Sequence, residues 1–494
     1  MTYRRCRLTE GVHAALRWNS IRLPFLLGAA LCVSPAAGMS VTGSDWRVHF
    51  NLPDQNGSMV AAGEFSIRDA LLARVDALRT GHVATLSTFT FSGSSASAGA
   101  AGPILTAIDR ALNTGATVRF IADSDVNIHS NFNGVHSLTS LAARPINPLI
   151  LSRETNTALV MHHKFALFDY GPGQRWVFTG SANYTGGAGT FQWNVALEAR
   201  NDVLYAAYAA EAAELLAGRF QGHPAKSHAH DKTTFFLTGS WSNGTARFSP
   251  PADSSSGGDN PVTDIRAAIN GAAAEIVFAL NKLTLPVIAD ALVQAADRGV
   301  LIHGSIPLSD AGPGGTSAAI YNQLNNPANY ASTNRVHFVT PYSRADGSTL
   351  DAGEPDLVHA KYMVIDPWGE RPIAILGSPN WTATALSNTN GNDENLLFIP
   401  HREISRMFYG QFRRMTGAFP HRSDFWCHFD RFTAAPRLTL WMTDTNIYRV
   451  EFATPSAGNP AWSTWIPAVT GHVGHLSFTA SPDPSIWFRA RREP

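Results

Sequence analysis

The apolar residues of this chain follow two periods, one typical of strands and one typical of helices, and the two alternate along most of its length. Short apolar runs at residues 83–90 and 117–122 predict buried strands, because strands inside an α/β sheet are covered on both faces. Longer segments that start near Ser66 and Pro103 and stop before a glycine predict helices. This alternation predicts an α/β fold.

The same order of elements occurs a second time in the later part of the chain. Strands are expected at residues 275–283 and 300–306, and helices are expected to start near Thr263 and Pro286. Ser66 and Thr263 have side chains suited to cap the first helix of each copy. The repetition indicates two copies of one structural unit.

Two further matches extend this repeat to its ends. Residues 46–54 resemble residues 246–253, and a closing helix is expected at 203–217 and again at 403–416, each followed by glycine. We therefore predict two tandem α/β half-domains, with mixed β-sheets flanked by helices and related by a pseudo-twofold axis. The predicted halves are residues 39–235 and 236–432.

Three stretches inside the repeat have no clear period. Residues 123–157 and 307–357 are long and irregular, and we expect them to form the rim of a substrate cleft, with plain surface excursions as the alternative. Residues 222–231, the expected linker, contain three histidines. They have no carboxylate or cysteine partner at ligand spacing, so no metal site is expected there.

The first 38 residues have the composition of a secretory signal peptide. Five arginines precede the apolar run 23–33, and Ala36-Ala37-Gly38 offers small residues for cleavage. The run is shorter than the ~20 apolar residues that a membrane-spanning helix needs. We therefore expect export, with the mature protein secreted or periplasmic.

Residues 433–494 differ in character from the repeat. Short strand-like runs separated by proline, glycine and asparagine predict a small all-β module that resembles a sandwich. Its tryptophans form either the core of the module or a face for lipid or glycan. They are Trp441, Trp462, Trp465 and Trp487.

Charge and cysteine content limit the classes of partner. Without residues 1–38 the chain has 33 basic and 37 acidic residues, a formal net charge of −4, so no domain-wide basic field favours nucleic acid. Of three cysteines only Cys427 remains, which excludes an internal disulfide. Stability must therefore come from a sizeable hydrophobic core.

Side chains that carry chemistry recur at matched spacing inside the repeat. His162, Lys164 and Asp169 are followed by Ser181 and Asn183. The second half has the same five residue types at identical offsets: His359, Lys361, Asp366, Ser378 and Asn380. Two copies of one half-site are therefore expected.

Apolar residues flank each His-x-Lys, so we expect both motif residues on one buried strand. Side chains alternate along a strand, which would place His162 and Lys164 on one face and direct His163 away. The Gly-Pro-Gly turn at 171–173 predicts a hairpin to the strand that leads to Ser181. Imidazole, ammonium, hydroxyl and carboxamide on one face suit a phosphate, which needs a nucleophile or proton donor and donors to its oxygens.

The doubled pattern His-x-Lys-x4-Asp with a downstream Gly-Ser-x-Asn resembles the phospholipase D superfamily, over about residues 45–432. The resemblance implies that one histidine forms a covalent phosphohistidine and the other acts as general acid, without metal or cofactor. It implies donors to the phosphate oxygens from Lys164, Lys361, Asn183 and Asn380, with hydroxyl donors from Ser181 and Ser378. We interpret Asp169 and Asp366, beyond the strand ends, as structural turn anchors.

The family also places an acid downstream to orient each histidine. Glu394 stands at this position in the second half, and Asn194 stands there in the first. If each lies beside the histidine of its own half, an amide would leave His162 neutral for attack and a carboxylate would favour protonated His359. We therefore predict His162 as nucleophile and His359 as general acid, an asymmetry that resembles the tyrosyl-DNA phosphodiesterases.

The resemblance implies a metal-independent phosphodiesterase. We expect it to release phospholipid headgroups during transient contact with a membrane surface, and to act as a monomer. A nuclease is the alternative within the same class, because neither motif identifies the alcohol on the phosphate. A catalytically silent phosphate-binding or attachment protein is the alternative from another class, although complete motifs in both halves count against it.

Overall fold

The computed structural model describes residues 40–51, 66–92, 101–132, 134–185, 192–255, 257–339 and 358–416, and six strands between residues 425 and 492. The expected signal peptide, residues 1–38, lies outside the described residues. Residues 36–412, which contain nearly all of both predicted halves, form one compact unit, and the C-terminal strands belong to another. The described ranges contain no helix long and apolar enough to cross a membrane.

The first half forms a mixed sheet with the strand order β1-β2-β8-β7-β6-β3-β4-β5. Its strands are β1 (Ser40–Thr42), β2 (Trp46–Phe50), β3 (Val83–Thr88), β4 (Thr117–Ala122), β5 (Ile150–Arg153), β6 (Lys164–Asp169), β7 (Arg175–Gly180) and β8 (Val195–Arg200). Its helices are α1 (Ser66–Asp76), α2 (Ala101–Asn113), α3 (Leu138–Ala142) and α5 (Asp202–Leu216). Strands β3, β4 and β5 run parallel, and the expected hairpin joins β6 to β7.

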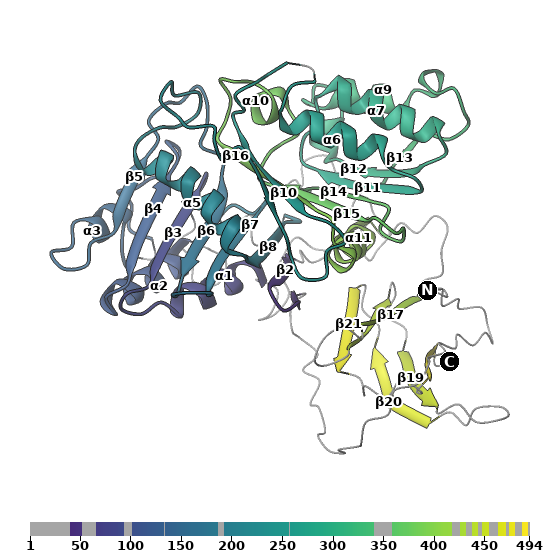
Figure 1. The fold of residues 1–494 in the computed structure, drawn as a ribbon, viewed down its shortest axis with the longest axis horizontal. Helices are drawn as coiled ribbons and strands as arrows, with labels where there is room; N and C mark the ends of the chain where they lie inside the picture. Colours follow the sequence, from purple (N-terminus) through teal and green to yellow (C-terminus); the bar gives the residue numbers. More distant parts are fainter. Residues whose placement is uncertain are drawn as a thin grey trace. The chain divides into compact units, whose positions relative to one another are not determined.

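The second half repeats this sheet with the order β13-β12-β11-β14-β15-β16-β10-β9. Its strands are β9 (Lys232–Phe235), β10 (Gly244–Ser249), β11 (Glu275–Leu280), β12 (Leu301–Ser305), β13 (Val336–Phe338), β14 (Lys361–Ile365), β15 (Ile373–Gly377) and β16 (Glu394–Ile399). Its helices are α6 (Pro261–Asn270), α7 (Pro286–Asp297), α8 (Leu308–Ala311), α9 (Ala318–Asn325), the 3-10 helix η1 (Pro327–Asn329), α10 (Ala383–Leu386) and α11 (Arg402–Thr416). The order is that of the first sheet read in reverse, which confirms two tandem copies of one α/β unit (Figure 1).

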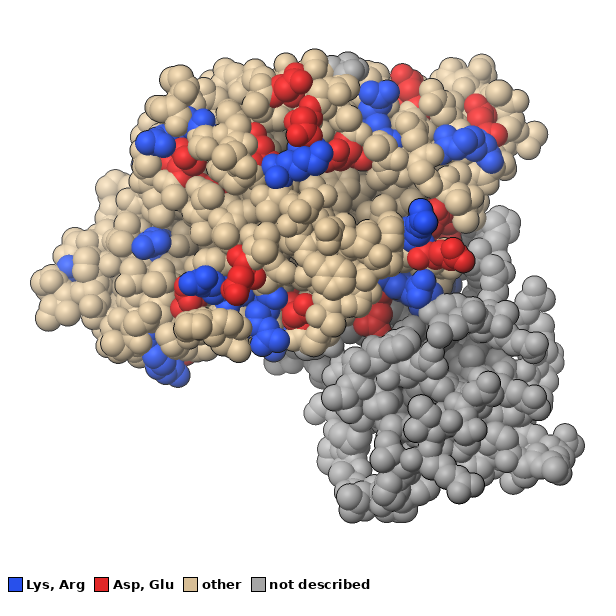
Figure 2. Space-filling model, in the orientation of Figure 1, with Lys and Arg blue, Asp and Glu red and all other residues tan. Residues whose placement is uncertain are grey.

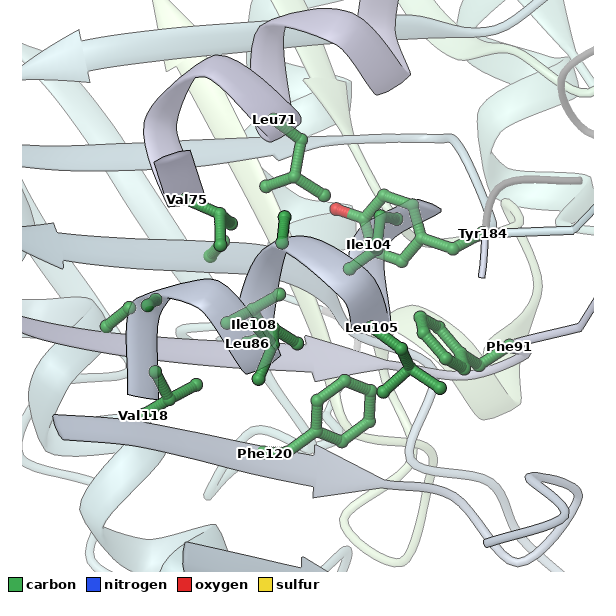
Figure 3. Packing of buried hydrophobic residues seen from close by; sticks show 14 of the residues in the cluster. Leu71, Val75, Leu86, Phe91, Ile104, Leu105, Ile108, Val118, Phe120 and Tyr184 are labelled. Atoms are coloured by element: carbon green, nitrogen blue, oxygen red, sulfur yellow. The ribbon is translucent and has the colours of Figure 1, made fainter. Parts of the chain in front are cut away.

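Helices cover one face of each sheet and provide much of the core. In the first half, Leu71 and Val75 of α1 and Ile104 and Ile108 of α2 pack toward Leu86 of β3, all fully buried (Figure 3). The spacing of the α2 residues forms the apolar stripe that a 3.6-residue period requires. In the second half, α6, α7 and α9 lie on one face of the sheet (Figure 1).

The closing helices α5 and α11 join the two sheets through aromatic rings. Each places one ring against a strand of its own half and a strand of the other half, with ring centroids 4.9 to 5.3 Å apart. The contacts join Tyr208 to Phe165 and Phe248, and Phe408 to Tyr362 and Phe50. This exchange holds the two halves together around their motifs.

Two predicted boundaries differ from the structure. Strand β9 (232–235), expected at the end of the first half, pairs with β10, so the second half begins before residue 236. Strand β17 (Phe425–Asp430), expected in the second half, pairs with β18, so the C-terminal module begins before residue 433. Strand pairing is a non-local contact, which composition along the chain does not reveal.

Two local expectations were also wrong. The N-cap of α6 is Asn260, whose side chain accepts from Thr263 N, because Pro261 opens the helix and displaces the start by three residues. The stretches 123–157 and 307–357 are not simply irregular, because the first contributes the helix α3 and the edge strand β5, and the second contributes the helices α8, α9 and η1 and the edge strand β13. Residues 340–357 of the second stretch lie outside the described residues.

The C-terminal strands form two antiparallel sheets, β17-β18-β21 and β20-β19-β22. The remaining strands are β18 (Arg437–Met442), β19 (Ile447–Ala453), β20 (Ser463–Thr470), β21 (Gly474–Thr479) and β22 (Trp487–Arg492). Two sheets agree with the predicted all-β module. The tryptophan side chains of this region are outside what the structure describes.

Candidate active site

Each motif histidine lies two residues before the start of a strand, and each motif lysine is the first residue of that strand. His162 precedes β6 and His359 precedes β14, so the expectation that His and Lys share one strand was wrong. The histidine backbones instead bond to the opposite half: His162 N donates to Asp393 O at 2.9 Å, and His359 N to Trp193 O at 3.2 Å. The two motifs therefore meet at the junction of the halves.

The side-chain neighbours of the histidines are exchanged relative to the prediction. His162 Nδ1 lies 2.7 Å from Glu394 Oε1, with the ring turned off the line of an ideal hydrogen bond. His359 Nδ1 lies 2.9 Å from Asn194 Oδ1. We expected Glu394 beside His359 and Asn194 beside His162. That was wrong. Asp393, which precedes Glu394, accepts the backbone N–H of His162, and Trp193, which precedes Asn194, accepts that of His359. Glu394 and Asn194 therefore each lie beside the histidine of the other half.

The two motif lysines are buried in this junction. Lys164 Nζ donates to His162 O at 2.8 Å, and Lys361 Nζ donates to His359 O at 2.7 Å. Burial lowers the pKa of Lys164 to about 7, against the opposing effect of Glu394, and lowers the pKa of Lys361 well below its usual value. A bound phosphate would favour the charged ammonium and reverse this shift.

The pKa values of the two motif histidines and of Glu394 are also shifted from their usual values. Burial, followed by the nearby lysines, lowers the pKa of both His162 and His359 well below the usual value. Burial raises the pKa of Glu394 to about 7. Strongly shifted groups gathered in one place are typical of catalytic sites.

The motif serines orient the side chains that meet the histidines. Ser181 Oγ donates to Asn194 Oδ1 at 2.9 Å, and Ser378 Oγ donates to Glu394 Oε2 at 2.6 Å. Each hydroxyl also accepts a backbone N–H from the adjacent strand. We expected these hydroxyls to donate to phosphate oxygens. The structure uses them instead to hold Asn194 and Glu394.

The glycine before each serine has a steric reason. A Cβ at Gly180 would lie 2.1 Å from Val195 O, and one at Gly377 would lie 2.1 Å from Asn395 O. Only glycine allows the backbone to approach the neighbouring strand this closely. That approach places the following serine against Asn194 or Glu394.

The motif asparagines follow β7 and β15 at equivalent places. The Oδ1 atoms of Asn183 and Asn380 are buried, and neither has a hydrogen-bond partner. An amide oxygen accepts hydrogen bonds, so these two atoms suit a donor and not an anionic phosphate oxygen. Only the Nδ2 groups of the two side chains could donate to a phosphate, and that role stays a prediction.

Asp169 and Asp366 lie at the opposite strand ends and do not join the site. Asp169 ends β6, accepts from Gly171 N at 2.9 Å and pairs with Arg175. Asp366 follows β14 with a φ of 48° and accepts three backbone N–H groups of residues 273–275. Both anchor turns about 16 Å of strand away from the lysines.

Two residues of the site were missed from the sequence. The ring of Phe89 lies 4.7 Å from that of His162 and 5.2 Å from Lys164 Nζ. Asp123 accepts from Met161 N at 2.7 Å, and its charge opposes the lowering of the Lys164 pKa by burial. Phe89 directly follows the carboxyl end of β3, and Asp123 directly follows that of the parallel strand β4. Ligands bind at the carboxyl ends of strands in α/β sheets, so the sequence could have indicated both residues.

The shifted pKa values predict how the rate depends on pH. Lys164 carries its charge below about pH 7, Glu394 ionises above about pH 7, and the pKa of His359, the expected general acid, lies well below its usual value. Loss of protonated His359 offsets the ionisation of Glu394 as the pH rises, so we expect kcat/KM for a phosphodiester to change little below about pH 7 and to fall steeply above it. Stopped assays from pH 5 to 9 measure this profile. A rate that keeps rising above pH 8 would contradict the role of Lys164, and the residual activity of Glu394→Gln should fall throughout this range as the pH rises.

Comparison with known proteins follows the same division of the chain. A family model described as "Cardiolipin synthase, PLD-like domain" matches residues 82–216 and 265–416, more than half of the chain and one copy in each half. The chain belongs to the phospholipase D superfamily. Its fold is that of the phosphodiesterases and phosphotransferases of this superfamily. No curated protein matches the sequence.

Solved structures show similarity at low identity. Polyphosphate kinase from Porphyromonas gingivalis is 12% identical with a TM-score of 0.47, over 74% of this chain and 46% of that one, so this chain spans less than half of that enzyme. Phosphatidylserine synthase from Haemophilus influenzae is 11% identical with a TM-score of 0.49, over 76% and 87%. Yeast tyrosyl-DNA phosphodiesterase is 10% identical with a TM-score of 0.42, over 72% and 90%.

Proposed function

We propose that this protein hydrolyses phosphodiesters, with phospholipid headgroup esters as the leading substrate, through a covalent phosphohistidine. The observation that carries the proposal is the single junction in which each motif histidine meets a side chain from the other half. One shared site provides two imidazoles, one for each face of an in-line displacement.

The proposed first step makes His162 the nucleophile. Its Nε2 attacks phosphorus, the bond from phosphorus to the leaving oxygen breaks, and His359 Nε2 gives that oxygen a proton. The lysines and the N–H groups of the Asn183 and Asn380 carboxamides stabilise the charge on the other phosphate oxygens. In the second step His359 removes a proton from water, the hydroxide attacks phosphorus, and the phosphorus–nitrogen bond to His162 breaks to release the phosphomonoester.

The exchanged neighbours give a new reason for this assignment. Phosphorylated imidazole is cationic, and Glu394 beside His162 can accept Nδ1–H and stabilise that charge. Asn194 orients His359 through the same ring nitrogen but carries no charge to retain its proton. A proton donor next to an amide therefore transfers its proton more readily.

The preference for lipid over nucleic acid is supported by charge and by one aromatic contact. The face seen in Figure 2 has basic and acidic side chains interspersed, without the basic tract that a phosphate backbone favours. Phe89 adds an apolar surface beside the nucleophile. We propose that the mature chain is secreted or periplasmic, contacts membrane surfaces transiently, and acts as a monomer.

Three substrates separate the candidate functions. The purified mature chain is incubated with phosphatidylcholine vesicles, sphingomyelin vesicles and single-stranded DNA, and the products are measured. Choline release from phosphatidylcholine is the expected result. DNA fragments with no lipid product would favour the nuclease, and no product from any substrate by the folded protein would favour the silent binding protein. His162→Ala serves as the inactive control.

Chelation tests how the phosphate charge is balanced. Two buried lysines and neutral donors surround the proposed phosphate position, so EDTA should leave the rate within about twofold of its starting value. A hydrolase that activates water on a metal would lose its nucleophile under the same treatment. The measurement is initial rate before and after dialysis against EDTA. Loss of activity that a divalent ion restores would contradict the mechanism.

A further inference from the structure

A buried ionic cluster lies beside Glu394, and the mechanism above does not use it. Its members are Glu211 of α5, Lys226 and His230 of the linker, His163 and Asp393. Lys226 Nζ lies 2.8 Å from Glu211 Oε1 and 2.5 Å from Asp393 Oδ1. Glu211 also meets His163 Nε2 at 2.9 Å and His230 Nε2 at 2.8 Å.

Burying these charged side chains costs desolvation free energy, so the cluster is expected to have a role other than stability. All five side chains are at most 8% exposed, and Glu211, His163 and Asp393 are fully buried. Taking two carboxylates and an ammonium out of water stabilises a fold no better than apolar residues of similar volume would. Buried ion pairs do fix geometry, because removal of one partner leaves the other charge unpaired.

The cluster holds the chain on both sides of the catalytic pair. Asp393 precedes Glu394, its carbonyl accepts the N–H of His162, and its carboxylate accepts from Gln221 N as well as Lys226. His163 follows His162, and its Nδ1 lies 3.2 Å from Oδ1 of Asn395, which follows Glu394. A shift of the cluster would therefore move His162 and Glu394 relative to each other.

The other catalytic histidine has no such support from equivalent positions. The repeat pairs Asp393 with Trp193, His163 with Ala360, and Glu211 with Gln411. All three counterparts are uncharged. The ionic cluster thus accompanies the His162–Glu394 pair and not the His359–Asn194 pair, which matches the asymmetric roles proposed for the histidines.

We propose that Lys226 and Asp393 are positioning residues for the nucleophile: Lys226 fixes Asp393, and Asp393 fixes the backbone of His162 and the direction of Glu394. The proposal rests on the phosphodiesterase function proposed above. It assigns a catalytic purpose to the linker between the halves, because Lys226 is contributed by that linker. Neither residue touches the substrate.

The test combines two variants with a matched control. Lys226→Met removes the ammonium, and Asp393→Asn removes one carboxylate charge while keeping its shape. Lys232→Met changes the lysine that begins β9, directly after the linker, whose side chain is 43% exposed and pairs with surface carboxylates. Each variant is assayed for kcat, KM and the pH profile of kcat on bis(p-nitrophenyl) phosphate, with folding checked by circular dichroism.

Positioning predicts a loss in kcat that depends on Glu394. Lys226→Met and Asp393→Asn should lower kcat about tenfold to a hundredfold, change its pH profile and leave KM nearly unchanged. In a Glu394→Gln background the same changes should have little further effect, because residues that act as a unit are not additive. Lys232→Met should behave as wild type.

Different results would contradict the positioning role and the proposed function. Folded variants with wild-type kcat and pH profile, or an equal loss in the Glu394→Gln background, would overturn the positioning role. If Lys226→Met does not fold, Asp393→Asn decides alone, because it keeps the shape of the site. Failure of the wild-type protein on every phosphodiester would instead overturn the proposed function.

Discussion

Replacing either His162 or His359 by alanine is expected to reduce phosphodiester turnover by roughly a thousandfold or more, and the double variant should be no worse than either single one. The reason is geometric. Each histidine depends on a side chain of the opposite half, so neither half contains a complete site. The measurement is kcat for wild type, both single variants and the double variant on one soluble substrate.

A histidine at the opposite end of β3 provides the control. His82 lies just before β3, whose opposite end leads to Phe89 and the site, so His82→Ala should retain wild-type activity. Survival of about half the activity in either motif variant would indicate two independent sites. That result would contradict the shared junction.

Phosphate from a labelled substrate is expected to be trapped on His162. A substrate with p-nitrophenol as leaving group needs little help from a general acid, so His359→Ala should still be phosphorylated. Release of the phosphate needs His359 to activate water, so the intermediate should accumulate with about one p-nitrophenol per enzyme in a burst. Rapid quenching and peptide mapping locate the label.

Each alternative location of the label has a distinct meaning. Label in wild type on the peptide with His359 would exchange the roles of the histidines. Label on neither peptide would indicate direct attack by water. His162→Ala should show no label, because the proposed nucleophile is absent.

The trapping result also decides between two physical arguments about the same neighbours. One argument holds that a nucleophile needs an uncharged neighbour, and with the observed contacts it would favour His359. The other holds that a carboxylate stabilises the cationic phosphohistidine, and it favours His162 beside Glu394. We favour the second, because the proposed covalent intermediate carries the positive charge.

Local patterns in the sequence predicted most of the fold. Strand β4 was predicted at its observed bounds, 117–122, and the two closing helices to within one residue at each end. The period of the apolar residues and the positions of glycine and proline reflect structure over a few neighbouring residues. They can therefore be recognised without knowledge of the tertiary structure. The repeat then implied that two copies would pack into similar sheets.

Domain boundaries, strand pairing and helix caps could not be predicted as well from local sequence patterns. The positions of β9 and β17 depend on which strand they pair with, and the cap of α6 depends on Asn260 three residues before the expected Thr263. Which strand pairing or cap forms depends on the relative free energies of alternative contacts. Spacing along the chain does not give these relative free energies.

The sequence by itself determined the residue types of the site and their duplication, because matched offsets of His, Lys, Ser and Asn are a property of the chain. Only the tertiary structure decided which groups meet. The halves exchange partners, so Glu394 faces His162 and Asn194 faces His359, and the serines turn toward these side chains. Lys226 gained its place in a buried cluster for the same reason: the linker folds back between carboxylates of both halves, a contact across 167 positions from Lys226 to Asp393 that no local pattern records.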